Sequence, residues 1–140
     1  MCHMPSLRLV AVSVLLSVLG AGSVATSGGA APVRQWAVVY LREPTLIGST
    51  IVHGPVLFTH DDARMARGGP CTTVQLFEPG NGPTESIASF HCIPTRRPVV
   101  ATFTLRTRPS LEDGIGCVLT EFQFAGDSEG HGVPTAANAH

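Results

Sequence analysis

The chain contains no lysine, and its charges of either sign are few. All nine basic residues are arginine, and ten acidic residues balance them to give a formal net charge of −1 at pH 7. Proteins that bind nucleic acid or acidic membranes through a broad electrostatic field carry a clear excess of positive charge. The charge balance therefore argues against both as partners and leaves a protein or a small anionic ligand as the candidate partners.

The sequence also lacks a hydrophobic run of the roughly 20 residues that a membrane-spanning helix needs. The apolar run Leu9–Leu19 is only eleven residues long, follows Arg8 and precedes a small-residue Ser-Val-Ala site at 23–25. This order is typical of a secretory signal peptide. We expect a signal peptide over residues 1–25, with cleavage near residue 30 as the alternative. The mature protein is then soluble, secreted or periplasmic, and no longer attached to a membrane.

Several motifs that carry known catalytic chemistry are missing as well. The chain has no phosphate-binding loop and no HxH or HExxH pair. An acid–base group at His60, Asp61 and Asp62 would make the protein a hydrolase, but the same residues suit the start of a helix better. We therefore expect no catalysis, and a hydrolase is the distant alternative.

Cysteine is scarce, and its positions matter because an exported protein folds in an oxidising compartment. Cys2 would be lost with the signal peptide, which leaves Cys71, Cys92 and Cys117. Cys117 is either a buried free thiol or the partner of one of the other two.

The run from Cys71 to Cys92 reads as two strands around Asn81-Gly82, the strongest short-range signal for a β-hairpin. Counting outward from this turn, Cys71 faces Cys92 at a position where Cα atoms lie about 4.5 Å apart. That spacing suits a disulfide. We predict a Cys71–Cys92 disulfide, which would contribute on the order of 3 kcal/mol to stability.

Glycine and proline fill 26 of the 140 positions, and strand-favouring residues are frequent between them. This mixture indicates many short strands joined by turns. We expect an all-β domain over residues 35–126, a small antiparallel β-sandwich or barrel of about seven strands. A flexible linker over residues 26–34 precedes it, and an extended C-terminal tail over residues 127–140 follows.

Turn signals at Arg42–Thr45 and His53–Pro55 separate the first expected strands. One short helical turn is expected at residues 60–69, where an aspartate can cap the N-terminus and Gly68 can end the helix. The expected strands are Trp36–Leu41, Leu46–Val52, Val56–Thr59, the two runs of the 71–92 hairpin, Pro98–Arg106 and Ile115–Phe124.

Strand directions followed outward from the hairpin place three histidines near one rim of the domain. Histidine nitrogens and a carboxylate oxygen are ligands suited to zinc or copper. His91 and Cys92 are adjacent on a strand, so their side chains point to opposite faces and cannot easily bind one ion together. The predicted metal site consists of His60, Asp62, His91 and His131.

The same rim gathers four arginines, which suggest a different kind of site. Guanidinium groups bind carboxylates and phosphates through paired hydrogen bonds. The predicted anion-binding rim consists of Arg64, Arg67, Arg96 and Arg97.

These features together predict a secreted, non-catalytic β domain with a binding or structural role, stabilised by a disulfide. The alternative is an exported metal-binding protein that uses the histidine and carboxylate rim. The two differ in a testable way, because only a metal protein would lose an ion when His60, His91 and His131 are replaced by alanine.

Overall fold

The computed structural model of the chain describes residues 33–135, so the expected signal peptide and most of the expected linker lie outside it. Within this range most residues are in strands and the one helix has five residues, so the all-β class is confirmed. The elements are β1 (Arg34–Ile47), β2 (Thr50–Asp61), α1 (Asp62–Ala66), β3 (Thr72–Glu78), β4 (Gly82–Phe90), β5 (Ile93–Arg96), β6 (Thr104–Pro109), β7 (Cys117–Gln123) and β8 (Glu129–Gly132).

The described strands form one sheet in the order β4-β3-β2-β1-β7-β8-β5, with β6 paired to β7 beside this path. Neighbouring strands are antiparallel except β1 and β7, which run parallel over two residue pairs, Thr45–Cys117 and Leu46–Val118. The expected sandwich or barrel is not confirmed, because the strands share a single sheet that does not close.

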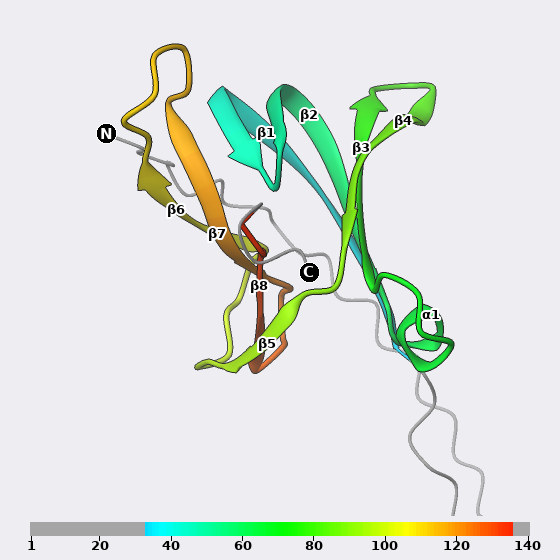
Figure 1. Cartoon of the computed structure of the whole chain (residues 1–140). Helices are drawn as coiled ribbons and strands as arrows, with labels where there is room; N and C mark the ends of the chain where they lie inside the picture. Colours follow the sequence, from blue (N-terminus) through cyan, green and yellow to red (C-terminus); the bar gives the residue numbers. More distant parts are fainter. Residues whose placement is uncertain (1–32, 136–140) are drawn as a thin grey trace, which may run out of the picture.

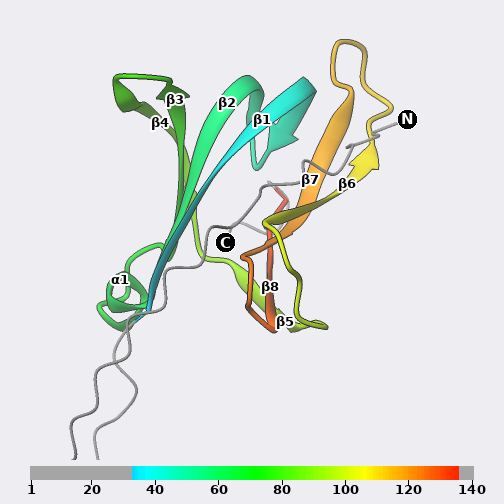
Figure 2. The ribbon, with the colours of Figure 1, turned by 180° about the vertical axis from the view of Figure 1, so that it is seen from behind.

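The short β1–β7 pairing divides the sheet into two wings (Figure 1, Figure 2). Strands β1 to β4 form the first wing, and strands β5 to β8 form the second. In Figure 1 the wings diverge toward the top and approach each other lower down, where the chain passes from β4 into β5. The sheet thus folds back on itself at one end.

One long hairpin, β1 with β2, replaces the first three predicted strands. The chain turns at Gly48, whose φ of +63° is a left-handed conformation that glycine adopts at low cost. The turns predicted at residues 42–45 and 53–55 are wrong. The first is a register irregularity inside β1, and the second lies within β2. A β-bulge accommodates extra residues without ending a strand, which is why these turn-like residues did not stop the ladder.

The predicted hairpin of β3 and β4 is confirmed with a shifted register. Glu78 pairs with Gly82, so the turn centres on Gly80, whose φ is +91°. Pro83 has no N–H for the tight turn that Asn-Gly would otherwise make. Two irregularities farther along bring Thr72 opposite Phe90. The two cysteines still flank the same end of the hairpin.

The predicted helical turn is also confirmed. Asp61 is the N-cap of α1, and its carboxylate accepts hydrogen bonds from the backbone N–H groups of Ala63 and Arg64 at 2.9 and 3.3 Å. Gly68 follows the helix with a φ of +78°, the usual stop. No helix in residues 33–135 is both long and apolar enough to cross a membrane.

The second wing departs most from the predictions. β6 begins at Thr104 and not at Pro98, whose carbonyl instead accepts a hydrogen bond of 2.8 Å from the Gln123 side chain. The segment predicted as an extended tail contributes β8, which lies between β7 and β5. Its sequence, Glu-Gly-His-Gly, has no apolar alternation, so nothing local marks it as a strand. This segment becomes a strand because it pairs with β5 on one side and with β7 on the other.

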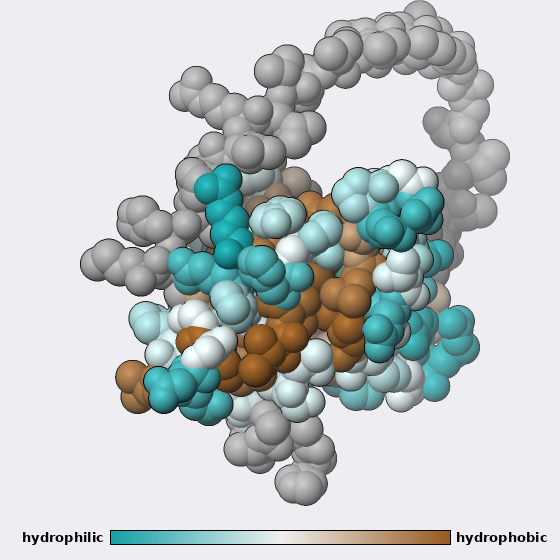
Figure 3. Space-filling view, turned by 90° about the horizontal axis from the view of Figure 1, so that it is seen from above, coloured by the Kyte–Doolittle hydropathy of each residue, from teal (hydrophilic) through white to brown (hydrophobic). Residues whose placement is uncertain are grey.

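The inward faces of both wings share one apolar core. Alternate residues of β2 and β3 are buried, as the two-residue period of a strand requires. Phe58 of the first wing contacts Phe122 of the second, with ring centroids 5.2 Å apart. Seen from above, apolar atoms form a continuous patch with hydrophilic atoms around it (Figure 3). The buried core residues are Leu41, Ile47, Val52, Val56, Phe58, Val74, Leu119, Phe122, Phe124 and Val133.

Candidate metal centre

The two edge strands of the open sheet, β4 and β5, are consecutive in the chain. β4 ends at Phe90 and β5 begins at Ile93, so only His91 and Cys92 carry the chain from the first wing to the second. This short link holds the wings together at one end. An interior corner forms there between β2, β3 and β8, and polar side chains gather in it.

Four side chains with metal-ligating atoms meet in this corner. His60 comes from the end of β2, Cys71 precedes β3, Cys92 lies in the link and His131 belongs to β8. His60, Cys71 and His131 are 3%, 1% and 1% exposed, and Cys92 is half-buried. Buried polar groups are unusual in proteins unless a partner satisfies them. We name these four side chains the His/Cys cluster.

Cys92 is at the centre of the His/Cys cluster. Its Sγ lies 2.9 Å from Sγ of Cys71, 3.5 Å from Nδ1 of His131 and 3.8 Å from Nδ1 of His60. The ligand atoms of His60, Cys71 and Cys92 all lie within 4.8 Å of one another. The rings of His60 and His131 have centroids 4.4 Å apart. Two sulfur donors and one nitrogen donor are thus gathered within the span of one coordination shell, and Nδ1 of His131 lies beside Cys92.

Asp62 orients the first histidine of the cluster. Nε2 of His60 lies 2.8 Å from Oδ1 of Asp62. An ionised carboxylate can only accept, so Nε2–H donates and Nδ1 carries the lone pair. That lone pair is on the side of the ring that faces Cys92. Metal-ligating histidines usually donate their other N–H to a carboxylate in this way.

His131 is held among aromatic rings. It stacks on Phe122 with centroids 5.0 Å apart and meets the edge of Phe124. Burial, followed by the charge of His60, lowers the pKa of His131 to about 4. The imidazole is therefore neutral at pH 7, which is the form that binds metals. Among the described residues, Nε2 of His131 is the one buried side-chain nitrogen or oxygen without a hydrogen-bond partner, and Oδ2 of Asp127 lies 3.9 Å from it.

Burial is also the first cause that raises the pKa of the Cys92 thiol to about 12, and its hydrogen bond with Cys71 is the second. A thiol with this pKa is protonated at neutral pH and is a poor nucleophile. It becomes a thiolate when a cation takes the place of its proton. The environment of Cys92 therefore suits metal binding better than catalysis by a cysteine nucleophile.

Two of the three donor distances around Cys92 match a tetrahedral zinc site. Bonds of about 2.3 Å to sulfur and about 2.05 Å to nitrogen place a sulfur and a nitrogen ligand about 3.6 Å apart, and two sulfurs about 3.8 Å apart. The two sulfur–nitrogen distances of 3.5 and 3.8 Å agree with this geometry. The sulfur pair, at 2.9 Å, is closer than zinc requires.

The structure gathers only part of the predicted metal site. His60 and His131 are in the cluster, and Asp62 holds His60 in place. His91 is exposed and lies outside the cluster. It points outward because it precedes Cys92, whose side chain turns inward, as the alternation of adjacent residues requires.

Sequence reasoning assigned the two cysteines to a disulfide and therefore missed them as metal donors. A signal that joins them to a histidine is the ladder between β2 and β3. His60 pairs there with Thr72, the residue after Cys71. An alignment of these two strands would have placed an imidazole beside the thiol pair.

The predicted Cys71–Cys92 disulfide is not formed in this structure. Both thiols are free, with their sulfur atoms 2.9 Å apart. Since these two sulfurs face each other, neither is placed to pair with Cys117, which begins β7 opposite Thr45 of β1. The predicted proximity of Cys71 and Cys92 is confirmed, and the covalent bond between them stays a prediction.

The arginines of the predicted anion-binding rim are partly used inside the protein. Arg97 donates hydrogen bonds to both carboxylate oxygens of Glu121, the shortest at 2.6 Å. Arg64 donates to the Thr73 hydroxyl at 2.8 Å. The other two arginines of the rim are exposed. The rim is therefore not a set of four guanidiniums facing one ligand.

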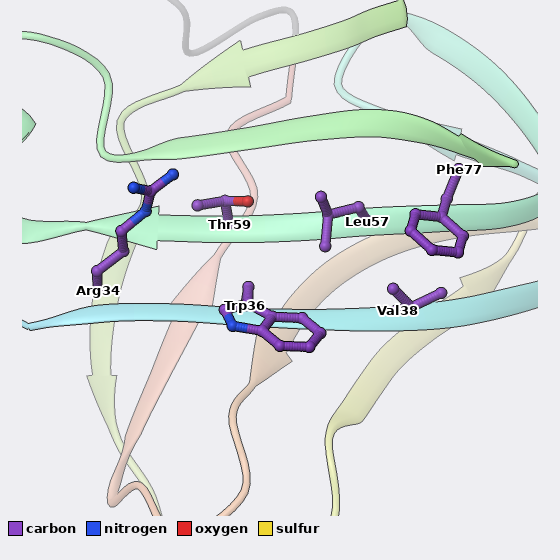
Figure 4. A pocket seen from close by; sticks show the side chains of 6 residues that line it. All are labelled: Arg34, Trp36, Val38, Leu57, Thr59 and Phe77. Carbon is purple, nitrogen blue, oxygen red and sulfur yellow. The ribbon is translucent and has the colours of Figure 1, made fainter. Parts of the chain in front are cut away.

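An open groove of about 560 Å³ lies on the outer face of the first wing (Figure 4). Trp36, within the groove, is 68% exposed, and Tyr40 on the same face of β1 is 59% exposed. Exposed apolar patches of this kind often mark a surface that contacts another molecule. We name it the outer-face groove, and its lining residues are Arg34, Trp36, Val38, Leu57, Thr59 and Phe77.

No family model, no curated protein and no solved structure matches this chain. Its class is therefore defined by the fold and the site alone. It is an all-β protein with a cluster of histidine and cysteine side chains that could hold a metal ion.

Proposed function

We propose that this chain is a non-catalytic, metal-binding β domain in which one zinc ion joins the two wings of the sheet. The ligands are His60, Cys71, Cys92 and His131. The observation that carries the proposal is the gathering of two thiols and two imidazoles in one buried corner, three of them with ligand atoms within 4.8 Å of one another.

Zinc is the ion that this donor set favours. Two thiolates and two imidazoles fill a tetrahedral shell, which is the arrangement of structural zinc sites, whereas catalytic sites keep one position open for water. Copper(II), the other predicted metal, prefers square-planar or tetragonal surroundings. The two sulfur–nitrogen distances from Cys92 support a tetrahedral arrangement.

A zinc ion would join the two wings where few contacts hold them. The wings share only two residue pairs in the β1–β7 ladder, and zinc would reinforce the corner where the His91–Cys92 link connects them. His60 and Cys71 belong to the first wing and His131 to the second. Since such a site does not exist in the unfolded chain, its binding free energy becomes folding free energy. The proposed role is therefore structural.

The N-terminal sequence supports export of this domain, with Leu9–Leu19 as the apolar centre of a signal peptide. Outside the cytoplasm, thiols in close proximity are readily oxidised to disulfides. Two thiols at 2.9 Å are protected there by a bound metal or become a disulfide. Both outcomes fit a stabilising role for Cys71 and Cys92.

Native mass spectrometry of the reduced full-length chain with added zinc tests the proposal. One zinc per chain is expected, and cobalt in its place should give the visible absorption of a tetrahedral thiolate site. The double variant Cys71→Ser with Cys92→Ser should lose both signals. His91→Ala is the matched control, because it removes an exposed imidazole next to Cys92 and should keep both. Stoichiometric zinc binding by the double cysteine variant would refute the proposal.

A second candidate function is ligand binding at the outer-face groove, favoured by the exposed ring of Trp36 and the guanidinium of Arg34 in the same lining. A ligand with an apolar body and one anionic group fits this chemistry. Trp36 is the only tryptophan of the chain, so its fluorescence reports the groove directly. Titration with dodecanoate should shift the emission to the blue, and Arg34→Ala should weaken the response. An unchanged spectrum would end this candidate.

A further inference from the structure

We propose that the zinc site is controlled by the redox state of its own two cysteines. Oxidation of Cys71 and Cys92 to a disulfide expels the ion, and reduction restores the site. This inference rests on the proposed function and adds a means of regulation to it. The spacing, the unequal exposure and the chemistry of the two sulfur atoms support this control.

The distance between the two sulfur atoms is longer than in a disulfide and shorter than in a zinc site. Sγ of Cys71 and Sγ of Cys92 are 2.9 Å apart. A disulfide needs a separation of about 2.04 Å, and a tetrahedral zinc site needs about 3.8 Å. Either product therefore requires a change of only about 0.9 Å in this distance. Small side-chain rotations supply such a change, so the backbone of the hairpin has no need to move.

The zinc-bound state and the disulfide state of Cys71 and Cys92 exclude each other. Zinc binds thiolates, whereas each sulfur of a disulfide has shared its electron pair with the other and is no longer an anionic ligand. Oxidation would leave His60 and His131 as the remaining donors of the cluster. Two neutral imidazoles alone do not make the closed four-ligand shell of a structural zinc site. The ion is then released.

The unequal exposure of the cysteines sets the order of the steps. Cys92 is half-buried and Cys71 is 1% exposed, so an oxidant reaches Cys92 first. The backbone N–H of Cys92 donates a hydrogen bond of 3.2 Å to Sγ of Cys71, which holds the second sulfur beside the first. Zinc binding removes the proton from both sulfurs, so in the zinc-loaded chain the Cys92 thiolate is the attacking residue and Cys71 the resolving one.

A small-molecule disulfide is the oxidant that this chemistry requires. The Cys92 thiolate attacks one sulfur of oxidised glutathione, forms a mixed disulfide and releases one glutathione thiolate, which takes up a proton. The Cys71 thiolate then attacks Sγ of Cys92, forms the protein disulfide and releases the second glutathione, which is protonated in turn. The protein loses two electrons, glutathione disulfide gains them with two protons, and one Zn²⁺ leaves.

The positions of arginine make the disulfide easy to observe. The described chain has no arginine between Arg67 and Arg96, and lysine is absent, so trypsin releases both cysteines in one peptide, residues 68–96. Oxidation within this peptide lowers its mass by two hydrogens. Cys117 falls in another peptide and does not affect the reading.

The experiment treats the zinc-loaded full-length chain with excess oxidised glutathione, measures released zinc with a chromogenic indicator and follows peptide 68–96 by mass spectrometry. One zinc should leave for each peptide that loses two hydrogens, and a thiol reductant with added zinc should reverse both changes. In Cys71→Ser, the mixed disulfide at Cys92 should persist, since the resolving thiol is gone.

Two results would overturn the inference. Zinc that stays bound while peptide 68–96 loses two hydrogens would show that the states do not exclude each other, and zinc loss without the disulfide would show another cause. Both leave the zinc site itself in place. A reduced wild-type chain that binds no zinc instead refutes the proposed function, and this inference with it.

Discussion

The His/Cys cluster and the outer-face groove are opposite exceptions to the rule that polar groups are exposed and apolar groups buried. In the cluster, imidazoles and thiols are buried, whereas in the groove the indole of Trp36 is exposed to water. Both regions draw on the same strand, because β2 sends Phe58 and His60 inward and Leu57 and Thr59 outward. Buried polar groups and exposed apolar patches are the informative exceptions in a protein.

The His/Cys cluster and the outer-face groove differ in where a partner for their side chains must come from. A buried polar group must be satisfied from within, and an unsatisfied one costs about 1–3 kcal/mol. Nε2 of His131 is such a group, and the imidazole of His60 and the thiol of Cys71 are buried from water with it. An exposed aromatic ring costs the folded chain little and gains only when another molecule covers it. Changes in the cluster should therefore alter stability, and changes in the groove should alter binding.

The largest expected effect is that of zinc on stability. Zinc at about 1,000 times its dissociation constant should raise the free energy of unfolding of the reduced chain by about 4 kcal/mol. Urea unfolding with zinc or with chelator measures the difference. Trp36→Ala, in the groove, should keep the whole shift, and Cys71→Ser with Cys92→Ser should lose it. Equal shifts in both variants would remove the contrast between the two regions.

A buried charge that already has its partners provides the next test. Glu121 is 6% exposed and is bound by Arg97 and Arg106 at 2.6 and 2.8 Å. Glu121→Gln should cost about 2 kcal/mol, because it leaves charge-assisted hydrogen bonds unmade. Glu85→Gln, an exposed change on β4, is the matched control and should be nearly neutral. Chemical denaturation measures both.

The ion pair of Glu121 with Arg97 also predicts how the stability of the protein depends on pH. The hydrogen bond from Arg97, opposed by burial and helped by the charges of Arg106, Arg97 and His131, lowers the pKa of Glu121 below 4.5. A carboxyl with a lowered folded pKa stabilises the protein above its unfolded pKa, and this contribution is lost as pH falls through the folded value. The stability difference between wild type and Glu121→Gln should therefore shrink below pH 4.5. A difference that grows in acid would contradict the assignment.

Asp62→Asn should have a smaller effect, confined to the cluster. An amide oxygen can still accept from Nε2 of His60, but the negative charge that raises the basicity of Nδ1 is gone. Zinc affinity should fall about tenfold, as measured by competition with a chelating indicator. Asp113→Asn removes an exposed carboxylate in the loop before β7 and should leave the affinity unchanged.

Trp36→Ala should have the smallest effect on stability, within about 0.5 kcal/mol of wild type, because the side chain is 68% exposed. It should instead reduce binding of an apolar fluorescent dye to the folded protein. A loss of stability comparable with that of Glu121→Gln would show that the outer face is covered within the protein, and the comparison of the two regions would fail.

Several local features could be predicted because neighbouring residues decide them. The capping aspartate Asp61 and the terminating Gly68 mark α1, and Asn81-Gly82 marks the β3–β4 hairpin. The opposite orientation of His91 and Cys92 follows from the period of a strand. Errors arose where a local turn signal was absorbed into a longer strand, as at residues 42–45, or where a strand such as β8 has no pattern of its own.

The amino-acid sequence by itself determined the all-β class, the hairpin that brings Cys71 near Cys92 and the charge balance of the surface, since all of these depend on composition or on contacts along a short stretch. Only the tertiary structure decided that His60 and His131 meet at those cysteines. They lie 71 positions apart in the chain, on different wings. Their meeting depends on the β4–β5 link folding the sheet onto itself, a consequence of strand order that no local pattern encodes.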